Sequence, residues 1–364
     1  MGDVGVIHFY YEVIMKNYII PIFIPHYGCQ HQCVFCNQHK ITGMQTNVTL
    51  EFINQTINRH LSLINQERHI EVAFYGGSFT ALNIKKQIEL LTPVYQFLKD
   101  DRIHAIRVST RPDCINKEVV DNLLNYGVST IELGVQSLDD QVLAASQRGH
   151  DRKSVFTAIH CIRQTKLRLG IQLMPGLPKD SLLRIMQTVS QTIKLKPDFV
   201  RIYPTLVLVN TSLATLFYEK KYTPLSLDIA VKYCASMKLV FERNHIPVIR
   251  VGLQATEALD GNEIVIAGPY HPAFGEMVDI YLFHIMVSQL FEKLDIKDKQ
   301  VIIHHHFKDT SKIRGMKNAN TTSWYRTFQP KNIVFKQDST KIGQIEIEFN
   351  GQQYNLNLNI ISNI

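Results

Sequence analysis

The sequence is poor in several features that would assign it to a special class of protein. It holds one tryptophan and six cysteines among 364 residues, and it has no low-complexity tract and no short repeat. Hydrophobic residues make up 45% and charged residues 20%, which are ordinary globular values that argue against disordered and fibrous classes. The length suits one large α/β domain with an appendage, or two modest domains.

The sequence also lacks an uninterrupted apolar run that would span a membrane. The most apolar helix candidate, residues 278–291, is broken by Asp279, His284, Ser288 and Gln289. The N-terminal stretch has no basic segment ahead of its apolar residues, as a secretory signal would. We therefore expect a cytoplasmic protein without a membrane partner. Residues 1–16 are expected to be an extension outside the fold, because the first convincing strand begins directly after Lys16.

A long block of basic residues is missing as well. The chain has 39 Lys and Arg against 32 Asp and Glu, a net charge of +7. This balance is compatible with a polyanionic partner such as nucleic acid, but it speaks to association and not to fold. Six cysteines do not make a disulfide framework in a cytosolic chain of this size. Cys114, Cys161 and Cys234 stand apart in apolar surroundings, and we predict that they pack in the core.

What the chain does contain is a repeated alternation of strand and helix patterns. Strands are predicted at residues 18–25, 69–77, 105–109, 130–135, 169–174 and 199–203, and helices at 50–64, 84–98, 117–126, 153–165 and 181–195. The alternation indicates βαβ units around a parallel sheet. Six such strands form either a partial or full βα barrel or an open doubly wound sheet.

Polar residues, glycines and prolines follow the predicted strands. These positions are the cysteine loop after the first strand, Gly76-Gly77-Ser78 after the second, Thr110-Arg111 after the third, Gln136 at the end of the fourth and Met174-Pro175-Gly176 at the end of the fifth. In a βα barrel the loops after the strands meet at one rim, where active sites lie. We therefore predict one shared site at that rim.

The loop after the first strand carries three cysteines in CxxxCxxC spacing, namely Cys29, Cys33 and Cys36. A closed zinc site needs a fourth ligand, so zinc remains an alternative in which the ligand is a nearby histidine: His26, His31 or His39. An iron–sulfur cube normally takes four thiolates. Three thiolates would leave one iron open to a substrate or cofactor.

These residues resemble the radical S-adenosylmethionine (SAM) superfamily, in which CxxxCxxC follows the first strand of a βα barrel and an aromatic residue, here Phe35, precedes the third cysteine. The resemblance implies a partial (β/α)6 TIM-like radical SAM barrel with a small α+β C-terminal extension. It also implies a [4Fe-4S] cluster that cleaves SAM reductively to a 5'-deoxyadenosyl radical. The cofactor carries this chemistry, and the protein supplies positioning and exclusion of water. Reduced ferredoxin or flavodoxin is the implied electron donor.

Further motifs are similar to the radical SAM part of the Elongator catalytic subunit family. They are PIFIPHYGCQHQCVFCNQ, FYGGSFT, STRPD, IELGVQSLDDQVLAASQRGHD, IQLMPGLP and RIYPTLVLVNTSL. The resemblance covers about residues 17–254 and implies modification of tRNA or another nucleic acid. The run ELGVQS with QRGHD also occurs in the oxygen-independent coproporphyrinogen dehydrogenase group, which leaves a tetrapyrrole or other small molecule as an alternative substrate. A non-catalytic iron–sulfur or zinc protein that binds RNA is the third alternative.

The resemblance implies roles for individual residues. Cys29, Cys33 and Cys36 would bind the cluster. The expected SAM-binding residues are Phe35, Gly76, Gly77, Ser78, Ser109, Thr110, Arg111, Gln136, Arg148, Met174 and Gly176. Arg111 would pair with the SAM carboxylate, and Arg148 and His150 would lie near the rim. Ser78 stands where many superfamily members have Glu. No catalytic residue and no oligomeric state follow from the sequence.

Some of these residues have structural interpretations too. The Gly76-Gly77 pair is typical of a tight strand-to-helix turn, and Glu132 is as well explained by a buried ion pair with a neighbouring Arg. The run His304-His305-His306 lies in a predicted strand, where neighbouring residues point to opposite faces, so we favour a solvated surface run over a metal site.

The C-terminal third departs from the Elongator family. No glycine-containing pyrophosphate loop of its acetyltransferase domain follows residue 254. Instead, a turn and an amphipathic helix are predicted, followed by short alternating strands. We expect four segments: an extension at 1–16, the barrel core at 17–206, a radical SAM C-terminal extension at 207–258 and an α+β module of unknown role at 259–364.

Overall fold

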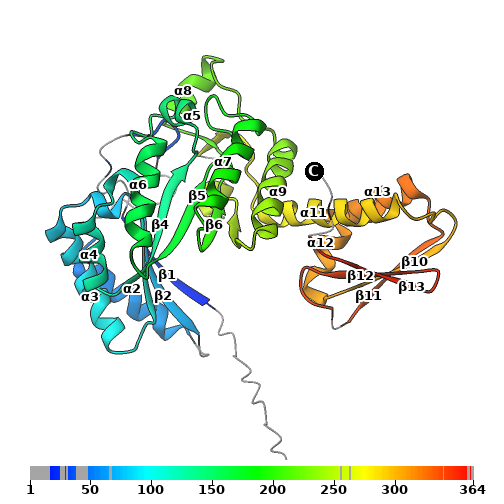
Figure 1. Cartoon of the computed structure of the whole chain (residues 1–364), viewed down its shortest axis with the longest axis horizontal. Coiled ribbons are helices and arrows are strands. Elements are labelled where there is room, and N and C mark those ends of the chain that lie inside the picture. Colours follow the sequence, from blue (N-terminus) through cyan, green and yellow to red (C-terminus); the bar gives the residue numbers. More distant parts are fainter. Residues whose placement is uncertain are drawn as a thin grey trace, which may run out of the picture.

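The computed structural model describes residues 17–24, 29, 32–37, 48–64, 68–254, 256–261, 264–338, 340–358 and 361. The predicted extension at 1–16 and the three histidines His26, His31 and His39 lie outside the described residues. The described chain forms a larger part, built on a curled parallel sheet, and a smaller part with a sheet of its own (Figure 1).

The larger part is built on seven parallel strands. They are β1 (Asn17–Ile24), β2 (His69–Gly76), β3 (Ala105–Thr110), β4 (Val128–Gln136), β5 (Arg168–Leu173), β6 (Phe199–Ile202) and β8 (Val248–Val251). They pair in sequence order, with β1 and β8 at the two edges of the sheet. The α/β partial barrel is therefore confirmed, and β8 adds a seventh strand from a segment that was predicted to lie beyond the barrel.

Helices on the outside of the sheet connect the strands (Figure 1). They are α2 (Leu50–Ser62), α3 (Ile84–Lys99), α4 (Lys117–Asn125), α5 (Asp140–Ala145), α6 (Arg152–Arg163), α7 (Leu182–Lys194) and α9 (Leu227–Arg243), with short 3-10 turns η1 (Phe79–Ala81) and η2 (Pro112–Cys114). Most begin at a capping side chain that accepts a hydrogen bond from the first turn, for example Asn83, Asn116 and Ser181. Each cap contributes about 1 kcal/mol and helps to fix where the helix begins.

A short ribbon follows the sixth strand of the barrel. It consists of β7 (Val207–Leu208) and β9 (Val265–Ala267), which pair antiparallel, and the chain between them includes α8 (Ser212–Tyr218) and α10 (Glu257–Asp260). Val207 and Leu213 belong to a small apolar cluster that is separate from the main core.

The two parts are joined by helix α11 (Phe274–Phe291), which packs against α9 in the larger part and against α12 in the smaller one. An amphipathic helix was predicted here, and that prediction was wrong: apolar residues lie all around α11, because it is covered on both sides. One carboxylate spans the junction. Asp279 Oδ1 lies 2.6 Å from Lys238 Nζ of α9, and its Oδ2 lies 3.3 Å from Lys312 Nζ of α12.

The smaller part is a four-stranded sheet with helices on one face. Its elements are β10 (Gln300–His305), η3 (Phe307–Asp309), α12 (Thr310–Arg314), η4 (Met316–Asn318), α13 (Ala319–Phe328), β11 (Asn332–Gln337), β12 (Ile345–Phe349) and β13 (Gln352–Leu356). The strand order is β11-β10-β12-β13, with only the first pair parallel. The histidine run alternates as predicted, but the prediction of a solvated surface run was wrong for His305. His305 is buried because it faces the helices that cover the sheet, whereas His304 is half-buried and bonded to Asp338.

None of the described helices has the length and apolar character needed to cross a membrane.

Candidate functional site

The three clustered cysteines lie in the loop after β1. Cys33 is buried, Cys29 and Cys36 are half-buried, and none of the three forms a disulfide in the described part of the chain. A tight turn joins the last two, since the backbone N–H of Cys36 donates to the carbonyl oxygen of Cys33 at 3.1 Å. Burial raises the pKa of the Cys29 thiol and the neighbouring Cys33 adds to this effect, while Arg111 and Arg148 act in the opposite direction. The thiols of Cys29 and Cys33 therefore share one electrostatic environment with two guanidinium groups.

Val34 fixes this loop to the rest of the molecule. Its N–H donates to the carbonyl of Ser146 at 3.2 Å, and its carbonyl accepts from the N–H of Leu213 at 2.7 Å. Its side chain is buried in the small apolar cluster with Val207, and Phe35 packs against the same cluster. The described part of the cysteine loop thus rests on backbone bonds to segments more than 100 residues away in sequence.

Arg148 reaches the cysteine loop from the segment after α5. Its Nη1 donates to Cys33 Sγ at 3.1 Å, and its Nη2 donates to the carbonyl oxygen of Gly134 on β4 at 2.6 Å. The residue is 6% exposed, and its Nε has no partner among the described groups. Arg148 was predicted to contact SAM, and in the structure it faces a cysteine.

Glycine at position 134 makes room for this arrangement. A Cβ atom there would lie 3.3 Å from Arg148 Nη2 and 2.9 Å from Gln136 Nε2. Gln136 is buried at the end of β4 with φ +68°, and its Oε1 accepts from Gln172 Nε2 of β5 at 3.2 Å. The side chain of Gln136 therefore lies over Gly134 beside the next strand, at the same strand ends as the arginine.

Arg111 is buried beside Asp113, directly after β3. Its Nε and Nη2 donate to the two carboxylate oxygens of Asp113 at 3.0 and 2.9 Å, while its Nη1 has no partner among the described groups. His150 Nδ1 lies 3.9 Å from Asp113 Oδ1. Burial, aided by the charge of Arg148, lowers the pKa of His150 to about 4, so the imidazole is neutral at pH 7. One donor of Arg111 thus remains available to an anion.

Ser78 is fully buried and bonded within the protein. Its hydroxyl oxygen lies 2.9 Å from Thr110 Oγ1 and accepts from the backbone N–H of Arg111 at 3.2 Å. Thr110 Oγ1 also lies 2.6 Å from Thr80 Oγ1. These hydroxyls tie the loop after β2 to the loop after β3. Cys114, which was predicted to pack in the core, is half-buried in this neighbourhood, where burial and the charge of Asp113 raise the pKa of its thiol.

The Gly76-Gly77 pair forms the turn at the end of β2. Gly76 has φ +94°, where side chains are disfavoured, and a Cβ there would lie 3.3 Å from the carbonyl carbon of Ile24. The N–H of Gly77 donates to the carbonyl of Ile24 at 2.9 Å. The turn therefore packs against the strand end from which the cysteine loop departs, and Ser109 lies half-buried on the neighbouring β3.

The loop after β5 is held by two side chains. Met174 begins it, and its N–H donates to the carbonyl of Gln136 at 2.9 Å. Gly176 donates its N–H to Asp180 Oδ2 at 3.0 Å and accepts from the hydroxyl of Tyr222 at 2.6 Å. Burial raises the pKa of Asp180 to about 6. These anchors hold Met174 and Gly176 at the same strand ends as the other predicted residues.

A charged layer spans the sheet at the level of β2, β3, β4 and β6. Arg107 pairs with both Glu71 and Glu132, and Arg201 Nη2 lies 3.1 Å from Glu132 Oε1. Arg201 also donates to the hydroxyl of Tyr75 at 3.0 Å. The predicted ion pair of Glu132 is therefore present. Two arginines and two glutamates balance within this layer, which makes it a self-contained structural network.

The described residues can be tested for a metal. Among them, no three His, Cys, Asp or Glu side chains converge on a single ion. Thiolates that each bind a different iron of a cube need not converge, and three cysteines with a guanidinium donor suit an anionic cluster of this kind. The histidines that would complete a zinc site lie outside the described residues.

The sequence alone missed the two anchoring carboxylates, Asp113 and Asp180. The signal for Asp113 is its place two residues after Arg111 on a 3-10 turn, and that for Asp180 is its position before the Ser181 cap.

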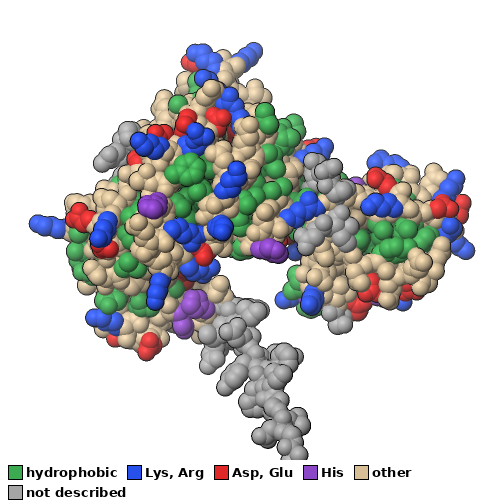
Figure 2. Space-filling view, viewed as in Figure 1, with side chains coloured by type: hydrophobic (Ala, Val, Ile, Leu, Met, Phe, Trp, Pro, Cys, Tyr) green, Lys and Arg blue, Asp and Glu red, His purple; other side chains and the backbone are tan. Residues whose placement is uncertain are grey.

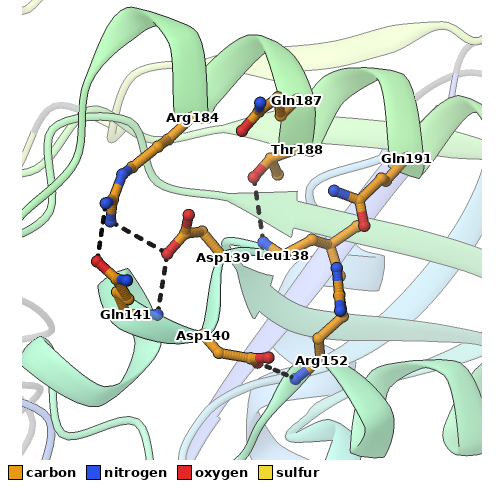
Figure 3. A pocket seen from close by; sticks show the side chains of 9 residues that line it. All are labelled: Leu138, Asp139, Asp140, Gln141, Arg152, Arg184, Gln187, Thr188 and Gln191. Carbon is orange, nitrogen blue, oxygen red and sulfur yellow. Dashed lines mark hydrogen bonds and ion pairs between the residues drawn. The ribbon is translucent and has the colours of Figure 1, made fainter.

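A separate polar pocket of about 190 Å³ lies among α5, α6 and α7 (Figure 3). Its polar groups are bonded to one another: Arg184 donates to Asp139 at 3.2 Å and to Gln141 at 2.8 Å, and Thr188 accepts from the N–H of Leu138. No residue predicted for the site lines it, so the strand ends remain the candidate site.

Two family models match most of the larger part of the chain. Residues 23–189 match the model of the radical SAM superfamily, and residues 197–283 match that of the radical SAM C-terminal domain. A tRNA uridine(34) acetyltransferase of Dehalococcoides mccartyi is 29% identical over 175 residues, or 43% of this chain and 38% of that protein. Human Elongator complex protein 3 is 32% identical over 134 residues, or 36% of this chain and 24% of that protein.

Among solved structures, archaeal Elp3 from Methanocaldococcus infernus superimposes with a TM-score of 0.60 at 20% identity, covering 74% of this chain and 63% of that one. This likeness shows the fold. The chain spans well under half the length of the two curated relatives that it matches.

Proposed function

The chain belongs to the radical SAM superfamily and is an enzyme of that class, and on this premise we propose that Cys29, Cys33 and Cys36 bind a [4Fe-4S] cluster and that the protein cleaves SAM. The observation that carries the proposal is the set of three cysteines in one loop at the strand ends, beside a buried guanidinium that donates to Cys33. Once bound, the cluster would supply the electron that breaks the sulfonium bond of SAM.

The side chains around this loop are suited to hold SAM. The free Nη1 of Arg111 is available to the SAM carboxylate, and the Gly76-Gly77 turn offers backbone groups to the methionine amino group. Phe35, Met174 and Gly176 would contact the adenine. Ser109, Thr110 and Gln136 would lie towards the ribose. The hydroxyl of Ser78 is already bonded to Thr110 and to the backbone of Arg111, so it would hold these two residues in position.

We further propose that the substrate is tRNA in the cytoplasm, with reduced ferredoxin or flavodoxin as electron donor. The names of the curated relatives and the net charge of +7 support a tRNA substrate, because phosphate neutralisation dominates nucleic-acid affinity. The charge is dispersed: on the face drawn in Figure 2, Lys and Arg lie on both parts and alternate with acidic side chains. The chain does not carry the Elongator acetyltransferase signature in its sequence, so acetyl transfer is not part of the proposal.

The first experiment tests the chemistry. The protein is reconstituted anaerobically, its iron and sulfide are measured, and 5'-deoxyadenosine is quantified after addition of SAM and dithionite. We expect production in the parent and in a Cys161→Ala control, whose cysteine lies on α6, and loss in Cys33→Ala. A parent protein with a full cluster that never yields 5'-deoxyadenosine would refute the enzymatic proposal.

The second experiment tests the substrate. Nucleosides of tRNA from a deletion strain are compared with those of the parent strain by mass spectrometry. A missing or altered nucleoside that returns on complementation, and does not return with Cys33→Ala, supports tRNA. An unchanged profile would favour the alternative of a tetrapyrrole or other small-molecule substrate, which the ELGVQS and QRGHD runs bring into consideration.

A further inference from the structure

We infer that Arg148 sets the reduction potential of the cluster through its hydrogen bond to Cys33. This inference rests on the proposed function, because it concerns the same three cysteines. It gives the arginine a role at the cluster, beside the SAM contact that the sequence predicts for it. Towards the cluster, Arg148 would act as a positioning and tuning residue.

The guanidinium of Arg148 is held in place from several directions. Nη2 donates to the carbonyl of Gly134 at 2.6 Å, and the backbone N–H of Arg148 donates to the carbonyl of Leu143 at 3.1 Å. Gln147 and Gly149, on either side, adopt positive φ values of +51° and +71°, which are typical of turns. Nη1 is then directed at Cys33 Sγ, 3.1 Å away. The contact is built by β4 and the loop after α5, and not by a mobile surface side chain.

The charge of Arg148 is not balanced by a carboxylate. Arg111 is paired with Asp113, and the charged layer of Arg107 and Arg201 is paired with Glu132. Within the described residues, Arg148 makes no ion pair with Asp or Glu. A buried cation without a partner is energetically costly, so the arrangement is favourable only with an anion beside it. The anion that the geometry offers is the thiolate of Cys33.

A fixed positive charge at a cluster thiolate changes the energy of reduction. Reduction adds one negative charge to the cluster, and both the guanidinium and its hydrogen bond stabilise that charge. Arg148 therefore raises the reduction potential and makes the cluster easier for a donor to reduce. Removing it should shift the potential to a more negative value.

Three variants test this inference on the full chain without SAM, so that a SAM-binding role of Arg148 cannot contribute. Arg148→Met removes the charge and the hydrogen bonds. Arg148→Lys keeps the charge but cannot donate to Cys33 and to the carbonyl of Gly134 through two guanidinium nitrogens. Arg163→Met is the matched control. It removes the same charge from a half-exposed pair with Asp198, which precedes β6 and lies at the opposite ends of the strands. Iron and sulfide are measured first, and the potential is then determined by redox titration followed by electron paramagnetic resonance.

We expect a full cluster in the parent and in the control at the same potential, a clear negative shift in Arg148→Met and a smaller negative shift in Arg148→Lys. Equal potentials for the parent and Arg148→Met, with full clusters in both, would overturn the inference. If Arg148→Met does not assemble a cluster, the reduction potential of Arg148→Lys is compared with that of the parent. A negative shift then supports the inference, and an equal potential overturns it. Absence of a cluster from the parent would instead refute the proposed function and, with it, the basis of this inference.

Discussion

At the scale of single residues, the site depends on side chains that fix backbone turns. Asp180 is an example, because its carboxylate accepts from the N–H groups of Gly176 and Ser181 at 3.0 and 2.9 Å. It holds the loop that we propose to lie against the adenine. The carboxylate achieves this at an electrostatic cost, since burial raises its pKa to about 6.

The pH dependence of stability should reveal this cost. Because the pKa of Asp180 is higher in the folded protein than in the unfolded chain, its contribution is most favourable in acid and is lost as the pH rises through about 6. Asp180→Asn abolishes the titration. We therefore expect the free energy of unfolding of this variant, relative to the parent, to increase by roughly 1–3 kcal/mol between about pH 4 and pH 7. Urea unfolding at several pH values measures it.

Asp151 provides the contrast for this measurement. It caps α6, and its hydrogen bonds with Ser154 lower its pKa, so the stability that it contributes is present at neutral pH and lost in acid. The free energy of unfolding of Asp151→Asn, relative to the parent, should therefore change with pH in the direction opposite to that of Asp180→Asn. A pH-independent difference between Asp180→Asn and the parent would contradict the assignment.

At the level of residues, the sequence singles out the cysteine cluster, whose role stays a prediction, but it does not predict how the arginines are oriented. The CxxxCxxC spacing singles out Cys29, Cys33 and Cys36 by chemistry alone. Arg148 lies between positive φ values at Gln147 and Gly149, and no periodicity rule reports these. The pairing of Arg111 with Asp113 depends likewise on the 3-10 turn η2.

At the scale of elements, the strand and helix boundaries were predictable because periodicity and capping residues agree with the fold. The six predicted strands appear within two residues of their expected limits. Strand β8 was not predicted, because its four residues VIRV are only partly buried and carry no alternating pattern. Its place in the sheet comes from pairing with β6, which is a tertiary contact.

The charged layer between β2, β3, β4 and β6 permits a prediction at this scale. Arg107→Met leaves Glu71 and Glu132 buried with one shared cation removed. We expect a loss of about 3 kcal/mol in the free energy of unfolding, because an uncompensated buried charge is costly. Arg163→Met breaks a half-exposed pair with Asp198, and its free energy of unfolding should fall by less than about 1 kcal/mol. Urea unfolding monitored by circular dichroism compares them, and equal losses would argue against a structural role for the layer.

At the scale of the whole molecule, α11 makes the two parts depend on one another. The helix is apolar all around, and Asp279 bonds to both Lys238 and Lys312. The only tryptophan, Trp324, is fully buried in the smaller part, where its indole N–H donates to Ser288 of α11. Its fluorescence therefore reports on the smaller part, while circular dichroism reports on the whole chain.

We expect the two signals to give one coincident unfolding transition in the parent. Asp279→Ala should lower the midpoints of the fluorescence and dichroism transitions together. The expected loss in the free energy of unfolding is about 1–2 kcal/mol, because the substitution removes one partner from each of two half-buried lysines. Asp295→Ala, which removes only an exposed pair with Lys299, is the control and should change neither midpoint measurably. Separate fluorescence and dichroism transitions in the parent would show that α11 does not couple the parts.

The seven-stranded sheet has a further consequence, because its edge strands β1 and β8 do not pair with each other. A closed barrel presents its strand ends as a ring, so a reacting group has to enter from above. Among the described residues no further strand pairs with the outer side of β1 or β8, so the strands form no closed ring. If the substrate is the tRNA that we propose, this sheet does not require either end of the polynucleotide to be threaded through a ring.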